Sequence, residues 1–144
     1  MAKLMQLEIL TPEKSLIRRN DVTYVFLNTV YGGLGVLANH APVLATLKEG
    51  PLKVQDENGK LTFVYVEGGF AQIQDNKVVV LTRKAELAQN IDRGKYEQVK
   101  QEANNRLQNP DKFTDIGHTE KILHRAIGRL KTLDMAAEQK DFDI

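Results

Sequence analysis

Histidines are the side chains in this chain best suited to acid–base chemistry near neutral pH, but their surroundings argue against it. His40 has no serine among its near neighbours, and no carboxylate is closer in sequence than Glu49. A histidine after a turn more often hydrogen-bonds the loop backbone, which is the role we expect. His118 and His124 lie six residues apart, so they do not share one helical face, and the chain has no cysteine. The residues therefore predict neither a catalytic centre nor a metal site, and an enzyme built around His40 is the weakest interpretation.

Glycines gather in a second candidate segment, Gly32-Gly33-Leu34-Gly35, which leads through an Asn-His pair to Pro42. A phosphate-binding loop needs a lysine followed by serine or threonine at the start of a helix, and this segment has neither. Glycine permits backbone angles and close approaches that a side chain forbids, and proline fixes φ. We therefore interpret residues 32–42 as a shaped surface loop on a β-framework.

Basic residues form a third candidate group, because Lys121, Arg125 and Arg129 follow a spacing of four that aligns them along one side of a helix. Such a stripe is either a solvated face or a contact for an acidic surface or a polyphosphate. Glu120 and Asp134 dilute its charge, which argues against nucleic acid. Both readings remain open at this point.

The first half of the chain carries strand signals. An Asn-Gly pair ending at Gly59 separates two apolar runs and is a strong hairpin signal. Asp75-Asn76 joins two further apolar runs, and Gly68-Gly69 predicts a bulge or bend. Many short strands with closely spaced turns predict an antiparallel β-sandwich or flattened barrel over residues 1–84.

The second half of the chain has a residue pattern typical of helices. Asp92 is a suitable N-cap, apolar residues then recur at helical spacing, and Asn109-Pro110 ends the run. A loop over residues 110–118 leads to Thr119, which we expect to cap a second helix. The first helix has a narrow apolar stripe, so the pair needs a partner surface. We predict a helical hairpin over residues 85–144, after a short junction, that docks weakly and can detach.

Length and composition set outer limits. The chain has 144 residues and a formal net charge of +1, which fits one domain with a small appendage and gives no global field for nucleic acid or membrane. No apolar run is long enough for a secretory signal or a membrane span. We expect a cytosolic protein, unless a partner tethers it to a membrane.

Several segments together resemble one family. They are Ile9-Leu10-Thr11-Pro12-Glu13, then Leu34-Gly35-Val36-Leu37 to His40-Ala41-Pro42, then Val66-Glu67-Gly68-Gly69-Phe70-Ala71-Gln72-Ile73, and Lys84-Ala85-Glu86 with Ile91-Asp92. In this order they are similar to the epsilon subunit of the rotary (F-type) ATP synthases. The resemblance covers nearly the whole chain and agrees with a β-domain followed by a helical hairpin.

The resemblance implies a non-catalytic subunit of the central stalk, or rotor. Such a subunit binds the gamma subunit and rests on the membrane-embedded c-ring, and its C-terminal helices can reach the catalytic alpha/beta head and inhibit ATP hydrolysis. We then expect a peripheral protein on the cytoplasmic face of the bacterial cell membrane. The implied c-ring and gamma contacts are Tyr31, Gly32, Gly33, Leu34, Asn39, His40, Ala41 and Pro42, and the implied inhibitory face is Lys121, Arg125 and Arg129.

The segment of implied c-ring contacts departs from the family in two places. Ala38-Asn39 replaces a common Pro-Gly, and asparagine tolerates left-handed angles. Some members have an acidic residue where Gly33 stands, so a salt bridge to the c-ring is not expected there.

A regulatory ATP site is the other implied feature, and no other cofactor is expected. The family pattern Ile/Leu-Asp-x-x-Arg-Ala reads here Ile91-Asp92-Arg93-Gly94-Lys95-Tyr96. Lysine lacks the bidentate fork of arginine and tyrosine is far bulkier than alanine, so we expect weak or absent ATP binding. The implied site is Glu86, Ile91, Asp92, Lys95, Arg125 and Arg129. The alternative function is a free-standing ATP-sensing module that uses these residues.

Overall fold

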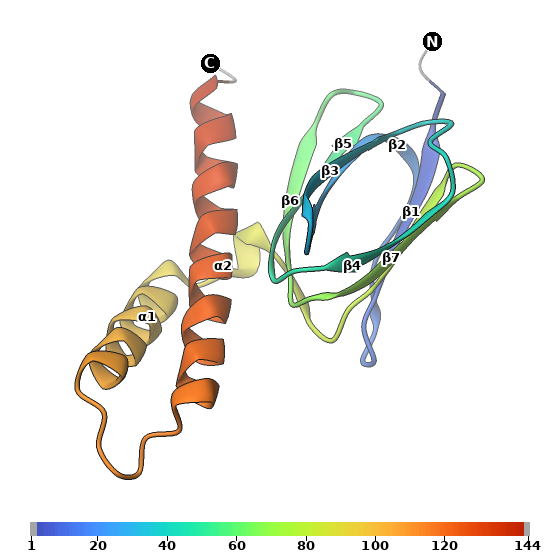
Figure 1. Cartoon of the computed structure of the whole chain (residues 1–144). Helices are drawn as coiled ribbons and strands as arrows, with labels where there is room; N and C mark the ends of the chain where they lie inside the picture. Colours follow the sequence, from blue (N-terminus) through green and yellow to red (C-terminus); the bar gives the residue numbers. More distant parts are fainter. Residues whose placement is uncertain (1–2, 143–144) are drawn as a thin grey trace.

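A β-domain is followed by two packed helices in the computed structural model, which describes residues 3–142 (Figure 1). The strands are β1 (Met5–Leu10), β2 (Ser15–Thr29), β3 (Gly32–Leu37), β4 (Val43–Leu47), β5 (Gly50–Asp56), β6 (Leu61–Val66), β7 (Gly69–Gln74), β8 (Lys77–Leu81) and β9 (Ala85–Leu87). A short 3-10 helix, η1 (Ala88–Asn90), leads to α1 (Arg93–Gln108) and α2 (Ile116–Phe142). The predicted fold class is confirmed.

The strands form one sheet that closes on itself around an aliphatic core. Its order is β1-β8-β7-β4-β2-β5-β6-β9, with β3 paired to β2 off this path, and a further pairing of β1 with β2 closes β1, β8, β7, β4 and β2 into a ring. All pairings are antiparallel except that of β1 with β8, which sets Leu10 beside Leu81. Side chains alternate in and out along β7, where Ala71 and Ile73 are buried and Phe70 and Gln72 are exposed. The period-two pattern therefore places one face of each strand in the core.

Both predicted hairpins are confirmed. The Asn-Gly pair joins β5 to β6, and Asp56 Oδ1 accepts hydrogen bonds from the backbone N–H groups of Asn58 and Lys60. Asp75 and Asn76 join β7 to β8 with φ of 53° and 60°. The glycine bend before β7 is also present, since Gly69 has φ of 104° and a Cβ there would overlap the Leu81 carbonyl.

The glycine-rich segment differs from its prediction as a loop. Gly32–Leu37 is strand β3, which pairs antiparallel with β2 and follows a tight turn at Val30 and Tyr31. The glycines serve close packing: a Cβ on Gly33 would lie 2.7 Å from Phe26 Cε2, and one on Gly35 would lie 3.0 Å from the Tyr24 hydroxyl. Aromatic rings of β2 thus cover the bare backbone of β3, which makes a glycine-rich strand stable.

The helix boundaries confirm one prediction and overturn another. Asp92 caps α1 by accepting a hydrogen bond from the backbone N–H of Lys95, and the helix ends just before Asn109. The second helix begins earlier than predicted, at Ile116, because Asp115 Oδ1 accepts from the backbone N–H of His118. Thr119 is therefore not the cap; its hydroxyl donates to the Asp115 carbonyl from inside the helix.

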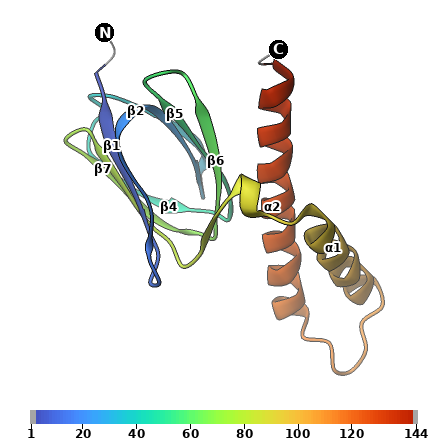
Figure 2. The ribbon, with the colours of Figure 1, turned by 180° about the vertical axis from the view of Figure 1, so that it is seen from behind.

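The helices lie beside the β-domain, with α2 between the sheet and α1. α2 packs on β5 and β6, and α1 packs on the opposite side of α2, as the front and back views agree (Figures 1 and 2). Strand β9 pairs with β6, so residues just after the predicted domain boundary at 84 belong to the sheet. Within residues 3–142, no helix is both long enough and apolar enough to cross a membrane. We call α1 and α2 together the helical arm.

Candidate functional site

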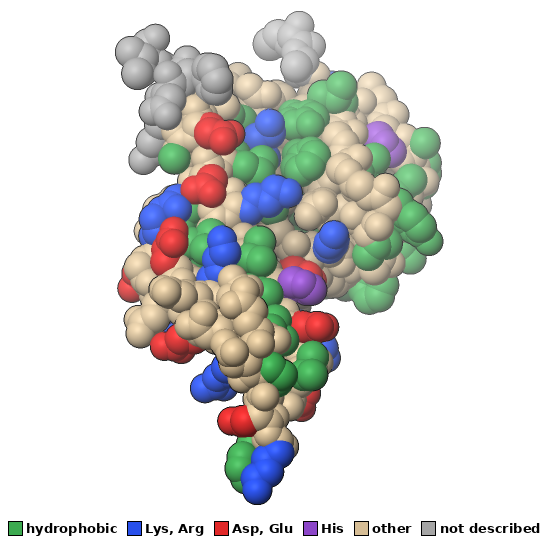
Figure 3. All heavy atoms as spheres, turned by 60° about the vertical axis from the view of Figure 1, so that its left-hand side comes forward, with side chains coloured by type: hydrophobic (Ala, Val, Ile, Leu, Met, Phe, Trp, Pro, Cys, Tyr) green, Lys and Arg blue, Asp and Glu red, His purple; other side chains and the backbone are tan. Residues whose placement is uncertain are grey.

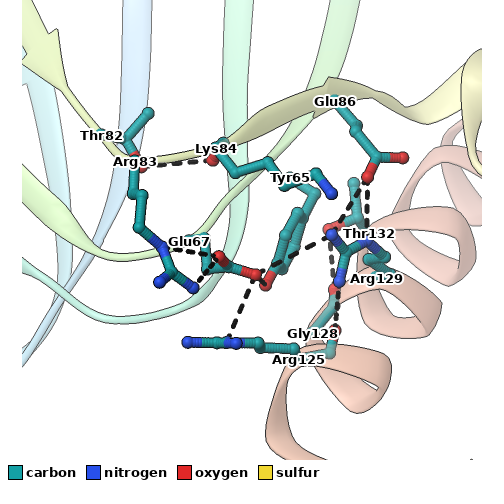
Figure 4. Close-up of polar contacts among 10 residues, drawn as sticks. All are labelled: Tyr65, Glu67, Thr82, Arg83, Lys84, Glu86, Arg125, Gly128, Arg129 and Thr132. Atoms are coloured by element: carbon teal, nitrogen blue, oxygen red, sulfur yellow. Dashed lines mark hydrogen bonds and ion pairs between the residues drawn. The ribbon is translucent and has the colours of Figure 1, made fainter. Parts of the chain in front are cut away.

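Charged side chains converge where the helical arm meets the β-domain (Figure 4). Glu67, directly after β6, receives Arg83 Nη2 at 2.7 Å on one carboxylate oxygen and Arg125 Nε at 3.4 Å on the other. Glu86 of β9 receives Arg129 Nε at 3.1 Å and Nη2 at 3.0 Å. Two carboxylates of the β-domain thus bind two arginines of α2, and we call Tyr65, Glu67, Glu86, Tyr96, Arg125 and Arg129 the docking cluster.

Arg129 is the most enclosed charged member of the docking cluster. Its side chain is 5% exposed, and its guanidinium carbon lies 4.4 Å from the ring centroid of Tyr65 and 4.6 Å from that of Tyr96. Tyr65 comes from β6 and Tyr96 from α1. An arginine between two aromatic faces combines stacking with cation–π attraction, so this one side chain holds three elements together.

A glycine permits this close approach of α2. Gly128 lies against the ring of Tyr65, and a Cβ there would lie 2.9 Å from Tyr65 Cε1 and 3.5 Å from the backbone of Gly50 in β5. Thr132, one turn further on, is fully buried and its hydroxyl donates to the Gly128 carbonyl. The helix face that carries Gly128 and Thr132 is therefore the one that touches the sheet.

The electrostatics of the docking cluster follow from its burial and from the three arginines around Glu67. Burial alone raises the pKa of Glu67, but the hydrogen bond from Arg83 and the charges of Arg125, Arg83 and Arg129 outweigh it and leave this pKa below its ordinary value. Burial raises the pKa of the Tyr65 hydroxyl, which donates to Glu67 at 3.2 Å. The carboxylate is thus charged and the phenol neutral across the physiological range.

A cleft of about 740 Å³ opens beside the docking cluster. Of the six residues predicted for an ATP site, Glu86, Lys95, Arg125 and Arg129 line it. Ile91 is instead buried, and Asp92 caps α1. Lys14, Arg83 and Lys84 add further positive charge to the wall, and Glu13, Glu67 and Glu86 oppose it. The cleft can attract an anion, but its own carboxylates already occupy the two arginines.

The predicted basic stripe is not one exposed face in this arrangement. Lys121 is exposed, Arg125 is half-buried and Arg129 is buried in the docking cluster. Acidic and basic side chains are interspersed over the arm, while apolar side chains gather over the β-domain (Figure 3). An inhibitory role for the three residues stays a prediction, and it requires the arm to leave the β-domain.

The predicted contact residues fall into two groups because β3 separates them. Tyr31, which is 99% exposed, stands at the β2–β3 turn with Gly32, Gly33 and Leu34 beside it. The second group, Asn39, His40, Ala41 and Pro42, follows the far end of β3, roughly 17 Å along the strand. Their roles stay predictions, but they are two patches and not one loop.

The second patch is ordered by local hydrogen bonds. Asn39 has φ of 66°, and its backbone N–H donates to Asn76 Oδ1 at 2.6 Å. His40 Nδ1 lies 2.7 Å from the Ala41 carbonyl, which is the bond to loop backbone expected for this histidine. Among residues 3–142, no three His, Asp or Glu side chains are grouped as ligands for a metal.

Sequence reasoning missed Tyr65, Glu67 and Arg83 as parts of the site. Glu67 had a signal, since it is a lone acidic residue between an apolar strand and two glycines. Tyr65 had none, because nothing in a strand pattern says which face a distant helix will cover. Its fully buried ring lies under α2.

Known proteins of similar sequence and structure lead to one family. The model of the beta-sandwich domain of the ATP synthase Delta/Epsilon chain matches residues 4–88. The chain is 38% identical to the ATP synthase epsilon chain of Desulforamulus reducens over 93% of this chain and 100% of the other. It is 34% identical to the ATP synthase epsilon chain of Staphylococcus aureus (strain JH9) over 91% and 97%.

Two solved structures agree with this. A chain in the cryo-EM structure of the Euglena gracilis mitochondrial ATP synthase, OSCP/F1/c-ring, aligns with a TM-score of 0.80 and 27% identity over 95% of this chain and 83% of that chain. A chain in the Tetrahymena thermophila mitochondrial ATP synthase central stalk and c-ring, at 16% identity and a TM-score of 0.57 over 90% and 96%, supports the fold alone. The chain therefore belongs to the epsilon-chain family of the F-type ATP synthases, whose members are non-catalytic subunits of the central stalk.

Proposed function

We propose that this epsilon chain couples the catalytic head and gamma subunit to the c-ring, and that its helical arm restrains ATP hydrolysis when it leaves the β-domain. The observation that carries the proposal is the way the arm is attached. The α2 face with Gly128 and Thr132 packs on β5 and β6, and Ala103 is the one buried residue of α1. An element attached along one face can separate from the sheet without unfolding it.

The β-domain is suited to a rigid coupling role. Its closed sheet is held by an aliphatic core, and Tyr31 stands fully exposed at a two-residue turn of that sheet. Relatives come from complexes whose names include the F1 head, the central stalk and the c-ring. We infer contacts with the gamma subunit and the c-ring, and a peripheral position on the cytoplasmic face of the bacterial membrane.

The two exposed patches can be tested separately for c-ring contact. Tyr31→Ser changes the β2–β3 turn, and His40→Ala changes the β3–β4 connection. Each variant would be assembled with gamma and isolated c-ring, and the retained c-ring measured. We expect at least one variant to retain less c-ring than the parent chain. Retention equal to that of the parent chain in both variants would contradict a contact at either patch.

Restraint of hydrolysis is tested by removing the arm. A chain ending at residue 91 retains all nine strands and η1 and lacks α1 and α2. Reconstituted with the remaining subunits, it should raise the rate of ATP hydrolysis relative to the full chain. The control is co-purification with gamma, which must be equal for both chains. An unchanged hydrolysis rate would show that the arm does not restrain this enzyme.

The alternative of a free-standing ATP sensor has less support. The full-length similarity is to epsilon chains, and the arginines of the cleft are already bound by carboxylates. Capture of the chain with gamma and the head supports the stalk subunit, whereas a lone monomer with tight ATP binding would support the sensor.

A further inference from the structure

We propose that Arg129 is an internal latch that keeps the helical arm docked without any bound anion, with Glu86 and Glu67 in the place that phosphate groups would otherwise take. The inference rests on the proposed function, since it assumes an arm that exchanges between docked and released states. It names the residues that hold the docked state. It also states that the docked state does not require a bound nucleotide.

The first argument is the use of the guanidinium donors. Nε and Nη2 of Arg129 both lie within hydrogen-bond distance of Glu86 Oε1, at 3.1 and 3.0 Å. Nη2 also lies 3.8 Å from Glu67 Oε1, and Nη1 reaches the Arg125 carbonyl at 3.5 Å. All three nitrogens therefore have acceptors inside the protein. A phosphate group at Arg129 would compete with these acceptors.

The second argument is enclosure. The ring centroids of Tyr65 and Tyr96 lie 4.4 and 4.6 Å from the guanidinium carbon, and 5% of the side chain is exposed. Those rings belong to the β-domain and to α1, while Arg129 belongs to α2. Release of α2 from the sheet must break the contact with Tyr65 and both carboxylate contacts. Arg129 thus responds to the position of the arm as a whole.

Arg129 is also paired with carboxylates. Removal of one partner from a buried ion pair is strongly unfavourable, because the other charge stays buried without compensation. Here Glu86 pairs with Arg129, and the single carboxylate of Glu67 is shared by Arg125 and Arg83. A polyphosphate approaching Arg129 would meet both carboxylates at close range and would be repelled by them. Anion binding in the cleft therefore does not strengthen the latch.

A single introduced thiol can report the release of the arm, because the natural chain has no cysteine. Thr132 is fully buried on the α2 face that touches the sheet, so a Thr132→Cys thiol reacts with a thiol reagent only when α2 moves away. The labelling rate of the full chain, divided by that of a free thiol, gives the released fraction. In the Thr132→Cys background, Arg129→Lys keeps the positive charge. It loses the planar guanidinium that binds a carboxylate through two N–H groups and stacks on the tyrosine rings.

We expect Arg129→Lys to raise the labelling rate about tenfold. The matched control is Arg93→Lys, which alters the exposed pair of Arg93 with Asp134 at 2.8 Å and should change the rate by less than about twofold. If Arg129→Lys does not fold, Glu86→Gln keeps the shape of the β9 side chain that binds Arg129 but removes its charge, and should raise the rate about threefold. An unchanged rate in the folded variants would overturn the latch.

ATP and pyrophosphate test the independence from anions. Addition of either at about 5 mM should leave the labelling rate of the parent chain unchanged, since a ligand that bound the docked state would slow it. Slowing by more than about threefold would overturn the proposal. The assay uses the full chain alone and measures no hydrolysis. Failure of the latch would change the labelling rate, and failure of the proposed inhibition would change the rate of ATP hydrolysis. The two failures are therefore distinguishable.

Discussion

Gly128→Ala should release the helical arm while strengthening the helix that carries it. The added Cβ would lie 2.9 Å from Tyr65 Cε1 and 3.5 Å from the Gly50 backbone. Neither neighbour can move easily. Tyr65 is fully buried with Arg129 against its ring, and Gly50 lies in β5 with φ of 152°. The helix must therefore shift away from the sheet to accept the methyl group.

The size of the effect follows from two opposing terms. Overpacking of a close contact by one carbon costs about 1–3 kcal/mol, and this cost exists only in the docked state. Replacing glycine by alanine inside a helix gains about 1 kcal/mol, and this gain is common to docked and released states where the helix persists. The docking equilibrium alone should thus shift by roughly 5- to 150-fold towards release, as about 1–3 kcal/mol requires.

Thiol labelling in the Thr132→Cys background measures this shift, and circular dichroism at 222 nm measures helix content. The matched control is Gly117→Ala in the first turn of α2, where a Cβ would meet only Asp115 Oδ1, at 3.7 Å. This control should gain helix stability and leave the labelling rate unchanged. Equal labelling rates in the two variants would refute the claim that Gly128 is the contact point of the arm.

Three other predictions concern acid, backbone strain and nucleotide. Acidification should release the arm: the folded pKa of Glu67 is lowered, so its contribution is fully present above its ordinary value of 4.5 and is lost as pH falls through the folded value. The near-ultraviolet circular dichroism of the tyrosines should report this release, and Glu67→Gln should abolish that dependence. Asn39→Ala should cost about 1–2 kcal/mol in urea denaturation because φ at this position is 66°. Asn39→Gly should cost less, and equal costs would contradict backbone strain. Calorimetric titration should find ATP binding weaker than about 0.1 mM, and tight binding without magnesium would contradict the reading of the cleft.

Local signals predicted the turns and the first helix well because the deciding contacts are close in sequence. The Asn-Gly turn before β6 is fixed by Asp56, two to four residues from its partners. Asp92 caps α1 through the residue three positions later. The start of α2 was harder, since Asp115 and Thr119 both have side chains suited to capping. The choice between them depends on which side chain accepts a hydrogen bond from a backbone N–H group in the first turn of the helix.

Features that depend on distant partners could not be predicted. The strand character of Gly32–Leu37 requires Tyr24 and Phe26 of β2 to cover its glycines, and composition alone favours a loop. Spacing within a helix left Arg129 open as part of a solvated stripe or of an anion contact, and only the family resemblance placed it with Glu86, 43 residues earlier in the chain. Helical periodicity says which side chains share a face, and only tertiary packing says which of them is buried.

The parallel pairing of β1 with β8 can form only late in the synthesis of the chain. Leu10 cannot meet Leu81 until some seventy further residues have been made, so the edge of β1 that faces β8 stays unpaired until then. Non-local pairing of this kind slows folding and leaves a strand edge exposed to misassembly in the meantime. The helical arm emerges only after β8, and α2 then meets a surface of β5 and β6 that is already complete. The segment made last is thus one that contributes no strand to the sheet.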